Sequence, residues 1–226
     1  NSEHPPSPPA EAGQALQRGT MVAIIALVQV FLITSCKQES EKPEFDPVEF
    51  VNPLMGTDSE FRLSTGNTYP AIAMPWGMNF WTPQTRNMNN GWAYTYDDFK
   101  IQGIKQTHQP SPWINDYGAF SLMAVTGRLK FGGEERASWF SHKAEIAKPY
   151  YYSVYLADYD VTAEVTPTER TALFRFTFPS CDSSYIILDA FDKGSMVRII
   201  PSEQKVIGYC RNNHGGVPEN FRNYIV

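Results

Sequence analysis

The sequence predicts an all-β domain, an antiparallel two-sheet β-sandwich, over most of its length. Short apolar runs alternate with turn residues from residue 48 onward, and no ten-residue stretch shows a strong helical period. The chain contains 17 Pro and 14% aromatic residues, a composition typical of short strands and turns rather than long helices. The predicted strands are residues 48–51, 71–74, 79–81, 119–125, 128–131, 150–156, 161–165, 171–178, 185–190 and 206–209.

Two of these runs show which faces are expected to be buried. In residues 171–178 the apolar side chains nearly alternate with Arg175 and Thr177, which indicates a strand with one wet face. Residues 183–191 are more continuously apolar and indicate a more buried strand. The last residues read as a loop that enters another strand, so we expect the domain to be cut at its C-terminus.

Charge and cysteine content exclude several classes of protein. There are 19 Lys and Arg against 24 Asp and Glu, a formal net charge of -5, so nucleic acid is not an expected partner. The three cysteines show no CxxC spacing, which argues against a zinc framework or a dense disulfide scaffold. Cys181 and Cys210 either pair or remain two unrelated thiols, because spacing does not fix connectivity.

The first 46 residues read as three segments ahead of the domain. Residues 1–20 are rich in Pro, Ala, Ser and Gly and are expected to be a disordered extension. Residues 21–36 hold an apolar run that fits a signal-peptide core, and the small residues before Cys36 resemble a bacterial lipobox, which makes Cys36 the predicted lipidation site. Residues 37–46 form a charged linker, and residues 47–226 form the sandwich.

This N-terminal pattern predicts an exported protein, lipid-anchored to a bacterial membrane in the periplasm or at the cell surface. Contact with a membrane is expected only through the lipid. The alternatives for the apolar run are a buried element of the domain or a weak membrane anchor.

Residues 91–118 are the predicted binding surface, because turn signals keep them near the surface and they combine aromatic with polar side chains. Flat apolar faces beside hydrogen-bonding groups suit a ligand such as a sugar. The aromatic residues are Trp92, Tyr94, Tyr96 and Trp113, and the polar residues are Asp97, Asp98, Gln106, His108, Asn115 and Asp116.

Several of these residues also have a structural interpretation. The alternative for Trp92 and Trp113 is core or interdomain packing, and the alternative for His108 is a structural hydrogen bond. Asp97 and Asp98 read as a solvated turn. Asp116 reads either as a turn cap or as a ligand contact.

Three ordered motifs resemble the N-terminal domain of glycoside hydrolase family 92, the calcium-dependent exo-acting α-mannosidases of Bacteroidetes. They are VNPLMGT at residues 51–57, GNTYPAIAMPWGM at residues 66–78 and GIKQTHQPSPWINDYG at residues 103–118. The third departs from the family pattern, because Gln106 replaces a histidine and residues 109–114 replace a glycine-rich loop.

The resemblance implies a β-sandwich joined to a C-terminal (α/α)6 barrel that holds the catalytic acid, the catalytic base and the calcium ligands. It therefore implies no catalytic residue and no metal ligand in this chain. Its partners would be a mannose-containing glycan and its own C-terminal domain. Trp92, by the same resemblance, lies where the family has a sugar-contacting tryptophan, and His108, Trp113, Asn115 and Asp116 are the further substrate-binding candidates.

The leading hypothesis is thus the N-terminal, carbohydrate-contacting part of an inverting α-mannosidase, inactive as a fragment. The rivals are a non-catalytic surface carbohydrate-binding lipoprotein and a structural interaction domain that needs neither sugar nor calcium.

Overall fold

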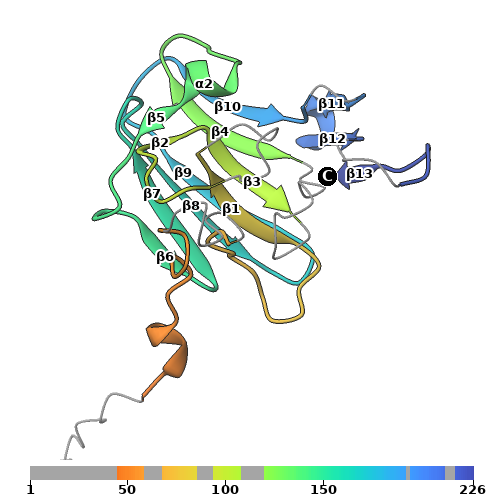
Figure 1. The fold of residues 1–226 in the computed structure, drawn as a ribbon. Coiled ribbons are helices and arrows are strands. Elements are labelled where there is room, and N and C mark those ends of the chain that lie inside the picture. The colour runs from red at the N-terminus through yellow and green to blue at the C-terminus, as the bar shows by residue number, and fades with distance from the viewer. Residues whose placement is uncertain (1–44, 59–67, 86–93, 108–119, 192–193, 212–216) are drawn as a thin grey trace, which may run out of the picture. The chain divides into compact units, whose positions relative to one another are not determined.

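The structure is a computed structural model, and it describes residues 45–58, 68–85, 94–107, 120–191, 194–211 and 217–226. The chain divides into two compact units, Asn1–Phe45 and Asp46–Val226. The second unit consists of antiparallel strands with a few short helical turns, so the all-β prediction is confirmed (Figure 1). The predicted extension, the signal peptide with Cys36, and nearly all of the linker lie outside the described residues.

Two four-stranded antiparallel sheets make up the sandwich. Sheet I has the order β1-β3-β4-β10 and sheet II the order β6-β7-β8-β9. The strands of sheet I are β1 (Phe80–Gln84), β3 (Gly103–Thr107), β4 (Ser121–Thr126) and β10 (Ser184–Asp189). Those of sheet II are β6 (Ile146–Lys148), β7 (Tyr151–Leu156), β8 (Val161–Pro167) and β9 (Ala172–Thr177).

Smaller elements flank these sheets. A short pair joins β2 (Lys100–Ile101) to β5 (Ser138–Trp139), and a three-stranded sheet contains β11 (Met196–Ile200), β12 (Lys205–Cys210) and β13 (Asn223–Ile225). The helical turns are η1 (Pro47–Phe50), α2 (Gly133–Arg136) and η4 (Pro201–Glu203). Strand β13 lies where the sequence indicated a loop entering another strand.

Three of the predicted strands are wrong. Residues 47–50 form a 3-10 helix, because Asp46 caps it by accepting the Val48 N–H (3.0 Å) and Pro47 supplies the φ of a first helical residue. Residues 71–74 contribute only an isolated bridge between Ile72 and Trp81 before a turn begins. Residues 128–131 form no strand and lead into α2.

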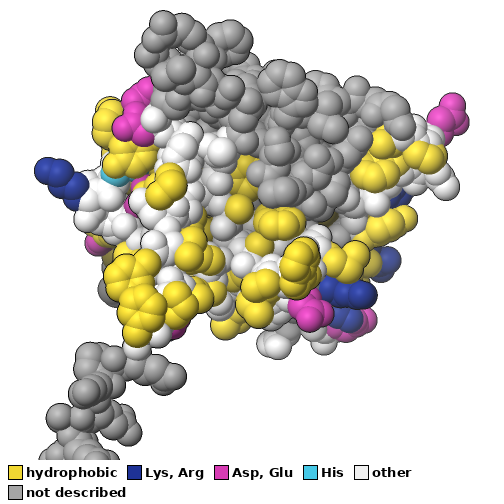
Figure 2. All heavy atoms as spheres, turned by 60° about the horizontal axis from the view of Figure 1, so that its bottom comes forward, with side chains coloured by type: hydrophobic (Ala, Val, Ile, Leu, Met, Phe, Trp, Pro, Cys, Tyr) yellow, Lys and Arg dark blue, Asp and Glu magenta, His cyan; other side chains and the backbone are white. Residues whose placement is uncertain are grey.

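The turn at residues 74–77 exposes a tryptophan in an unusual backbone conformation. The Gly77 N–H donates to the Met74 carbonyl (2.9 Å), Pro75 occupies the second position, and Trp76 has φ 61° in the third, where glycine is normally favoured. Trp76 is 99% exposed. Figure 2 views the molecule from the side that lies at the bottom of Figure 1, and exposed hydrophobic side chains are spread over that face.

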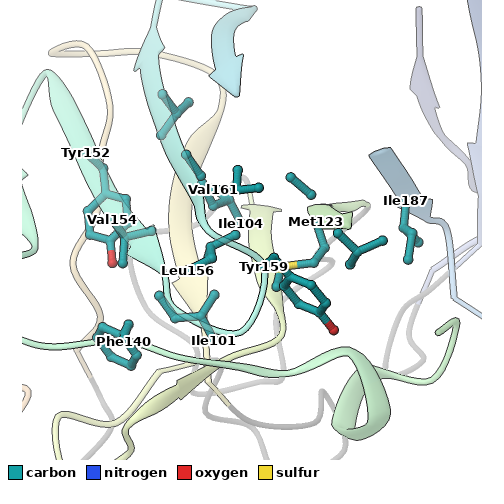
Figure 3. Packing of buried hydrophobic residues seen from close by; sticks show 14 of the residues in the cluster. Ile101, Ile104, Met123, Phe140, Tyr152, Val154, Leu156, Tyr159, Val161 and Ile187 are labelled. Carbon is teal, nitrogen blue, oxygen red and sulfur yellow. The ribbon is translucent and has the colours of Figure 1, made fainter. Parts of the chain in front are cut away.

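The hydrophobic core lies between the two large sheets (Figure 3). Val154, Leu156 and Val161 of sheet II point toward Ile104 and Met123 of sheet I. At the other end of the core the rings of Trp81 and Phe174 meet edge to face, with centroids 4.8 Å apart. Alternation along β7 and β9 therefore buries one face of sheet II and leaves the other outside.

A buried arginine ties three segments together beside this core. The Arg136 side chain is 1% exposed and donates from Nε to the Gln102 carbonyl (2.8 Å), from Nη1 to the Phe131 carbonyl (2.6 Å) and from Nη2 to Asp189 (2.6 Å). Each guanidinium nitrogen of Arg136 thus donates to an oxygen, and these hydrogen bonds offset the cost of burying the charge.

The cysteine bridge left open by the sequence does not form. Cys181 and Cys210 are both thiols, the first exposed and the second buried. Cys210 packs instead in a small cluster with Phe120 and Ala190, which joins the end of β10 to the three-stranded sheet.

Candidate functional site

The predicted substrate-binding residues Trp92, His108, Trp113, Asn115 and Asp116 lie outside the described residues. The structure does describe the ends of the two segments that carry them. Residues 86–93 begin after Thr85 and end before Tyr94, and residues 108–119 begin after Thr107 and end before Phe120. The contacts of these four end residues show how the fold holds the two segments at their bases.

Thr85 closes the base of the segment that contains Trp92. Its hydroxyl accepts the Thr95 N–H (3.0 Å) and donates to Oδ2 of Asp98 (2.9 Å). A turn follows, in which the Asp98 N–H donates to the Thr95 carbonyl (3.2 Å). Asp97 is exposed in this turn and Asp98 is half-buried, so the predicted solvated turn is present, with the Asp98 carboxylate accepting the Thr85 hydroxyl.

A buried cluster then anchors the chain at Tyr94. Oε1 of Glu145 lies 2.7 Å from Nδ1 of His142 and accepts the Tyr94 hydroxyl (3.3 Å), while Oε2 accepts the Tyr152 hydroxyl (2.7 Å). The side chains of His142 and Glu145 are 8% and 0% exposed. One carboxylate therefore joins Tyr94 to His142 and Tyr152, which are its own neighbours in sequence.

His142 is held on every side. Its Nε2 lies 3.2 Å from the Asp98 carbonyl, so each ring nitrogen lies within hydrogen-bonding distance of an oxygen. Tyr96 stacks on the imidazole with centroids 4.0 Å apart, and Phe140 meets it edge to face at 4.7 Å. Ring stacking and hydrogen bonding together fix the turn at residues 95–98.

The tyrosines of the cluster stay protonated. Burial, reinforced by the carboxylate of Glu145, raises the pKa of Tyr152 well above its ordinary value, and the same two causes raise the pKa of Tyr94. Both hydroxyls consequently act as donors to Glu145. Because its groups are buried and mutually satisfied, the cluster is suited to positioning the Trp92 segment rather than to acid or base catalysis.

Sequence reasoning missed this cluster. The sequence predicted that Tyr94 and Tyr96 lie on a ligand-facing surface. Tyr94 is instead buried at 1% exposure, and Tyr96 stacks on His142. His142 and Tyr152 lie three and seven residues from Glu145, but Tyr94 is 51 residues from Glu145, so no local pattern in the sequence signals that they meet.

The segment containing His108 is supported differently, by β3 and β4. The Gln106 N–H donates to the Phe120 carbonyl (2.7 Å), which closes the base of this second segment. Phe120 is fully buried. Gly103 allows the two strands to approach closely, because a Cβ there would lie 2.3 Å from the Ser121 hydroxyl oxygen.

A row of buried polar residues crosses sheet I next to this segment. Lys105 of β3 pairs with Thr82 of β1 on one side and with Ser121 of β4 on the other. Lys105 is only 4% exposed, and Thr82 and Ser121 are also buried. The strand that leads into His108 thus carries polar side chains in a buried setting, which is uncommon in a sheet that only builds a core.

The two supports lie at opposite ends of the β1 and β3 pair. Gln84, just before the first segment, pairs with Gly103, whereas Thr107, just before the second segment, pairs with Phe80. A strand rises about 3.4 Å per residue, so these ends are roughly 14 Å apart. The segments that contain Trp92 and His108 therefore leave this strand pair at opposite ends.

The described residues offer no metal centre. No group of three or more His, Cys, Asp or Glu side chains lies close enough to hold an ion in the part of the chain that the structure describes. Calcium, which the family resemblance implies, therefore does not fit these residues. In the same ranges, no helix is both long and apolar enough to span a bilayer.

The fold and the three motifs agree with a match to the family model described as the glycosyl hydrolase family 92 N-terminal domain, which covers residues 50–226. The chain belongs to this family, and the sandwich is its N-terminal domain. It is accordingly related to α-mannosidases, within a family of carbohydrate-active enzymes.

Solved structures and a curated relative agree. A family GH92 inverting mannosidase from Bacteroides thetaiotaomicron is 50% identical with a TM-score of 0.76, over 81% of this chain and 25% of that one. A GH92 α-mannosidase from the same organism, solved with mannoimidazole, is 30% identical with a TM-score of 0.58, over 72% and 22%. A protein of Arthroderma benhamiae described as an uncharacterized secreted glycosidase is 26% identical over 60% of this chain and 18% of its own length. The chain spans a quarter or less of each of these proteins.

Proposed function

We propose that this chain is the N-terminal part of a larger exported α-mannosidase and that it contributes part of the wall of the substrate pocket. The 50% identity to a structure named as an inverting mannosidase carries the proposal, because this chain aligns with only a quarter of that protein. The remainder of such an enzyme supplies the chemistry.

Hydrolysis with inversion needs two carboxyl groups about 6.5–9.5 Å apart, one to protonate the leaving oxygen and one to activate water. The buried Glu145 is committed to His142 and two tyrosines, and Asp98 is committed to Thr85. The acid and the base therefore come from a C-terminal (α/α)6 domain in this proposal. That domain also supplies the calcium ligands.

The role of the sandwich is to present Trp92 as a stacking platform, with His108, Asn115 and Asp116 as hydrogen-bonding groups and Trp113 as a second aromatic wall. The His142 cluster supports this assignment, since it fixes the chain two residues after Trp92. The buried polar row at Lys105 supports it at the other end, three residues before His108.

Full-length protein assayed on α-linked mannobioses tests the proposal. We expect release of mannose whose first-formed anomer is β, observed by proton NMR at early times, and loss of release after chelation that added calcium restores. The short chain alone is the matched control and is expected to be inactive. Full-length protein that binds calcium yet releases no mannose from any α-linked mannobiose would refute the proposal.

We further propose that residues 21–36 direct export and that Cys36 is lipidated. The apolar run followed by small residues and a cysteine supports this, and the Arthroderma benhamiae relative is named as secreted. Labelling of cells with a radioactive fatty acid should mark the wild-type protein and not a Cys36→Ser variant. Equal labelling of both would remove Cys36 as the anchor.

A further inference from the structure

The outer face of sheet II holds an open cavity of about 370 Å³ that the proposed pocket does not use. It is lined by side chains of β7, β8 and β9, among them Tyr151, Glu164, Leu173 and Arg175. This volume falls within the range of small-molecule sites, which are mostly apolar with a few fixed polar groups.

Strand register places these side chains next to each other. Glu164 of β8 pairs directly with Arg175 of β9, and Thr166 pairs with Leu173 in the neighbouring row. Both rows lie on the face of the sheet opposite to Phe174 and Phe176, which pack against the core. The site is thus built on paired strands, which hold it more rigidly than a loop would.

The polar groups of the cavity are already oriented. Arg175 donates from Nε to one oxygen of Glu164 and from Nη2 to the other, both at 2.5 Å, and the Tyr151 hydroxyl donates to Glu164 as well (2.5 Å). These partners lower the pKa of Glu164, Arg175 first and Tyr151 second, so the carboxylate is ionised at neutral pH.

This arrangement selects a neutral, hydroxylated ligand. The charges of Glu164 and Arg175 cancel, so neither an anion nor a cation gains from entering, while the Arg175 head, 72% exposed on its side chain, keeps N–H donors on its solvent side. Leu173, 70% exposed, and the Tyr151 ring supply apolar surface for the C–H face of a sugar ring. Hydroxyl pairs on adjacent carbons can then bond to the carboxylate and the guanidinium together.

We infer that the outer face of sheet II binds a sugar unit of a neutral glycan, through Tyr151, Glu164, Leu173 and Arg175. The inference rests on the proposed function for the choice of glycan, an α-mannan. Because sheet II lies across the core from the strands that lead to Trp92 and His108, a long or branched chain held there would keep the protein on its substrate between cleavage events.

Native gel electrophoresis of the full-length protein in gels containing soluble yeast α-mannan tests this inference. We expect retardation of the wild type by mannan and a dissociation constant about tenfold higher for Arg175→Ala, as expected for the loss of one charged hydrogen bond. Leu173→Glu, which places a charge on the apolar wall, should weaken retardation similarly. Both side chains are exposed, and thermal unfolding verifies that each variant is folded.

The matched control is Tyr155→Ala. Tyr155 lies on the same face of β7, is 44% exposed and donates to Asp160, but it does not line the cavity, so its retardation should equal that of the wild type. The inference is overturned if mannan does not retard the wild type, or if it retards Arg175→Ala and Leu173→Glu as strongly as the wild type. It is also overturned if Tyr155→Ala loses as much retardation as those two variants. Mannose release by the wild type from a mannobiose is read separately, so failure of the proposed function is distinguishable from failure of this site.

Discussion

Nδ1 of His142 lies 2.7 Å from Oε1 of Glu145 within the loop before sheet II, and the same oxygen accepts the hydroxyl of Tyr94 from the segment after Trp92. The other oxygen of this carboxylate accepts the hydroxyl of Tyr152 in β7, so Glu145 links Tyr94 to sheet II. The relationship matters for function because it determines how firmly the predicted sugar platform is held. It also yields the first two predictions.

Replacing Glu145 with alanine should lower the free energy of unfolding by about 3–5 kcal/mol, because His142 and two buried hydroxyls lose their acceptor. Urea unfolding followed by fluorescence measures the change. Glu203→Ala is the control, since the Glu203 ion pair with Lys205 is exposed and should be worth less than about 1 kcal/mol. Similar losses for both variants would show that the cluster does not stabilise the fold.

The buried tyrosines predict a loss of stability at high pH. The pKa values of Tyr94 and Tyr152 are raised in the folded protein, whereas in the unfolded chain a tyrosine titrates near pH 10. Their contribution is therefore complete below about pH 10 and declines as pH rises toward the folded pKa, by about 1.4 kcal/mol per pH unit for each tyrosine. Unfolding measured between about pH 9 and 12 should show a shallower decline for Tyr152→Phe than for the wild type; parallel curves would contradict the assignment.

Most of sheet II was predictable because its strands alternate between core and solvent, as Phe174, Arg175 and Phe176 show. Strand β3 was missed because Lys105, Gln106 and Thr107 are polar, and a buried polar strand carries no hydrophobic signal. At residues 48–51 the apolar pattern predicted a strand, but residues 47–50 form a 3-10 helix that Asp46 caps and Pro47 begins. The His142 cluster was not predictable, because Tyr94 and Glu145 are 51 residues apart in sequence and only the fold brings them together.

Gly103 should tolerate no side chain. An alanine Cβ would lie 2.3 Å from the Ser121 hydroxyl oxygen, which would have to rotate away, and 3.0 Å from the Leu122 carbonyl oxygen, so the backbone of β4 would have to shift slightly at the strand that leads to His108. We expect Gly103→Ala to cost about 1–3 kcal/mol, as overpacked cores do. Gly132→Ala, whose Cβ would meet only ordinary contacts at 3.7 Å or more, should change stability by less than about 1 kcal/mol. Thermal unfolding compares the two, and an unchanged midpoint for Gly103→Ala would contradict the close approach.

Trp76 is a large side chain that this chain should be able to lose. It is 99% exposed with φ 61°, so Trp76→Gly removes a left-handed strain of about 1–2 kcal/mol while adding about 0.5–1 kcal/mol of chain entropy. The net change in the free energy of unfolding should be close to zero. Trp81→Ala, which empties a core position against Phe174, should cost about 3–5 kcal/mol by comparison. A comparable loss for Trp76→Gly would mean that Trp76 packs within this chain.

Trp92→Ala in the full-length enzyme should raise KM or lower kcat for an α-mannobiose. The lost stacking face removes on the order of 0.5–1.5 kcal/mol of binding free energy, in addition to the contribution of the buried apolar area. The anchor at Tyr94 makes this variant informative, since the chain on that side of residue 92 is held by Glu145 whether or not the indole is present. Tyr94→Phe is the companion variant: it keeps the ring and the Trp92 side chain and removes the hydroxyl that donates to Glu145 and lies 3.5 Å from Nδ1 of His142. An effect of Tyr94→Phe on KM that equals the effect of Trp92→Ala would assign the change to the position of the segment. Unchanged kinetics for Trp92→Ala would remove that tryptophan from the site.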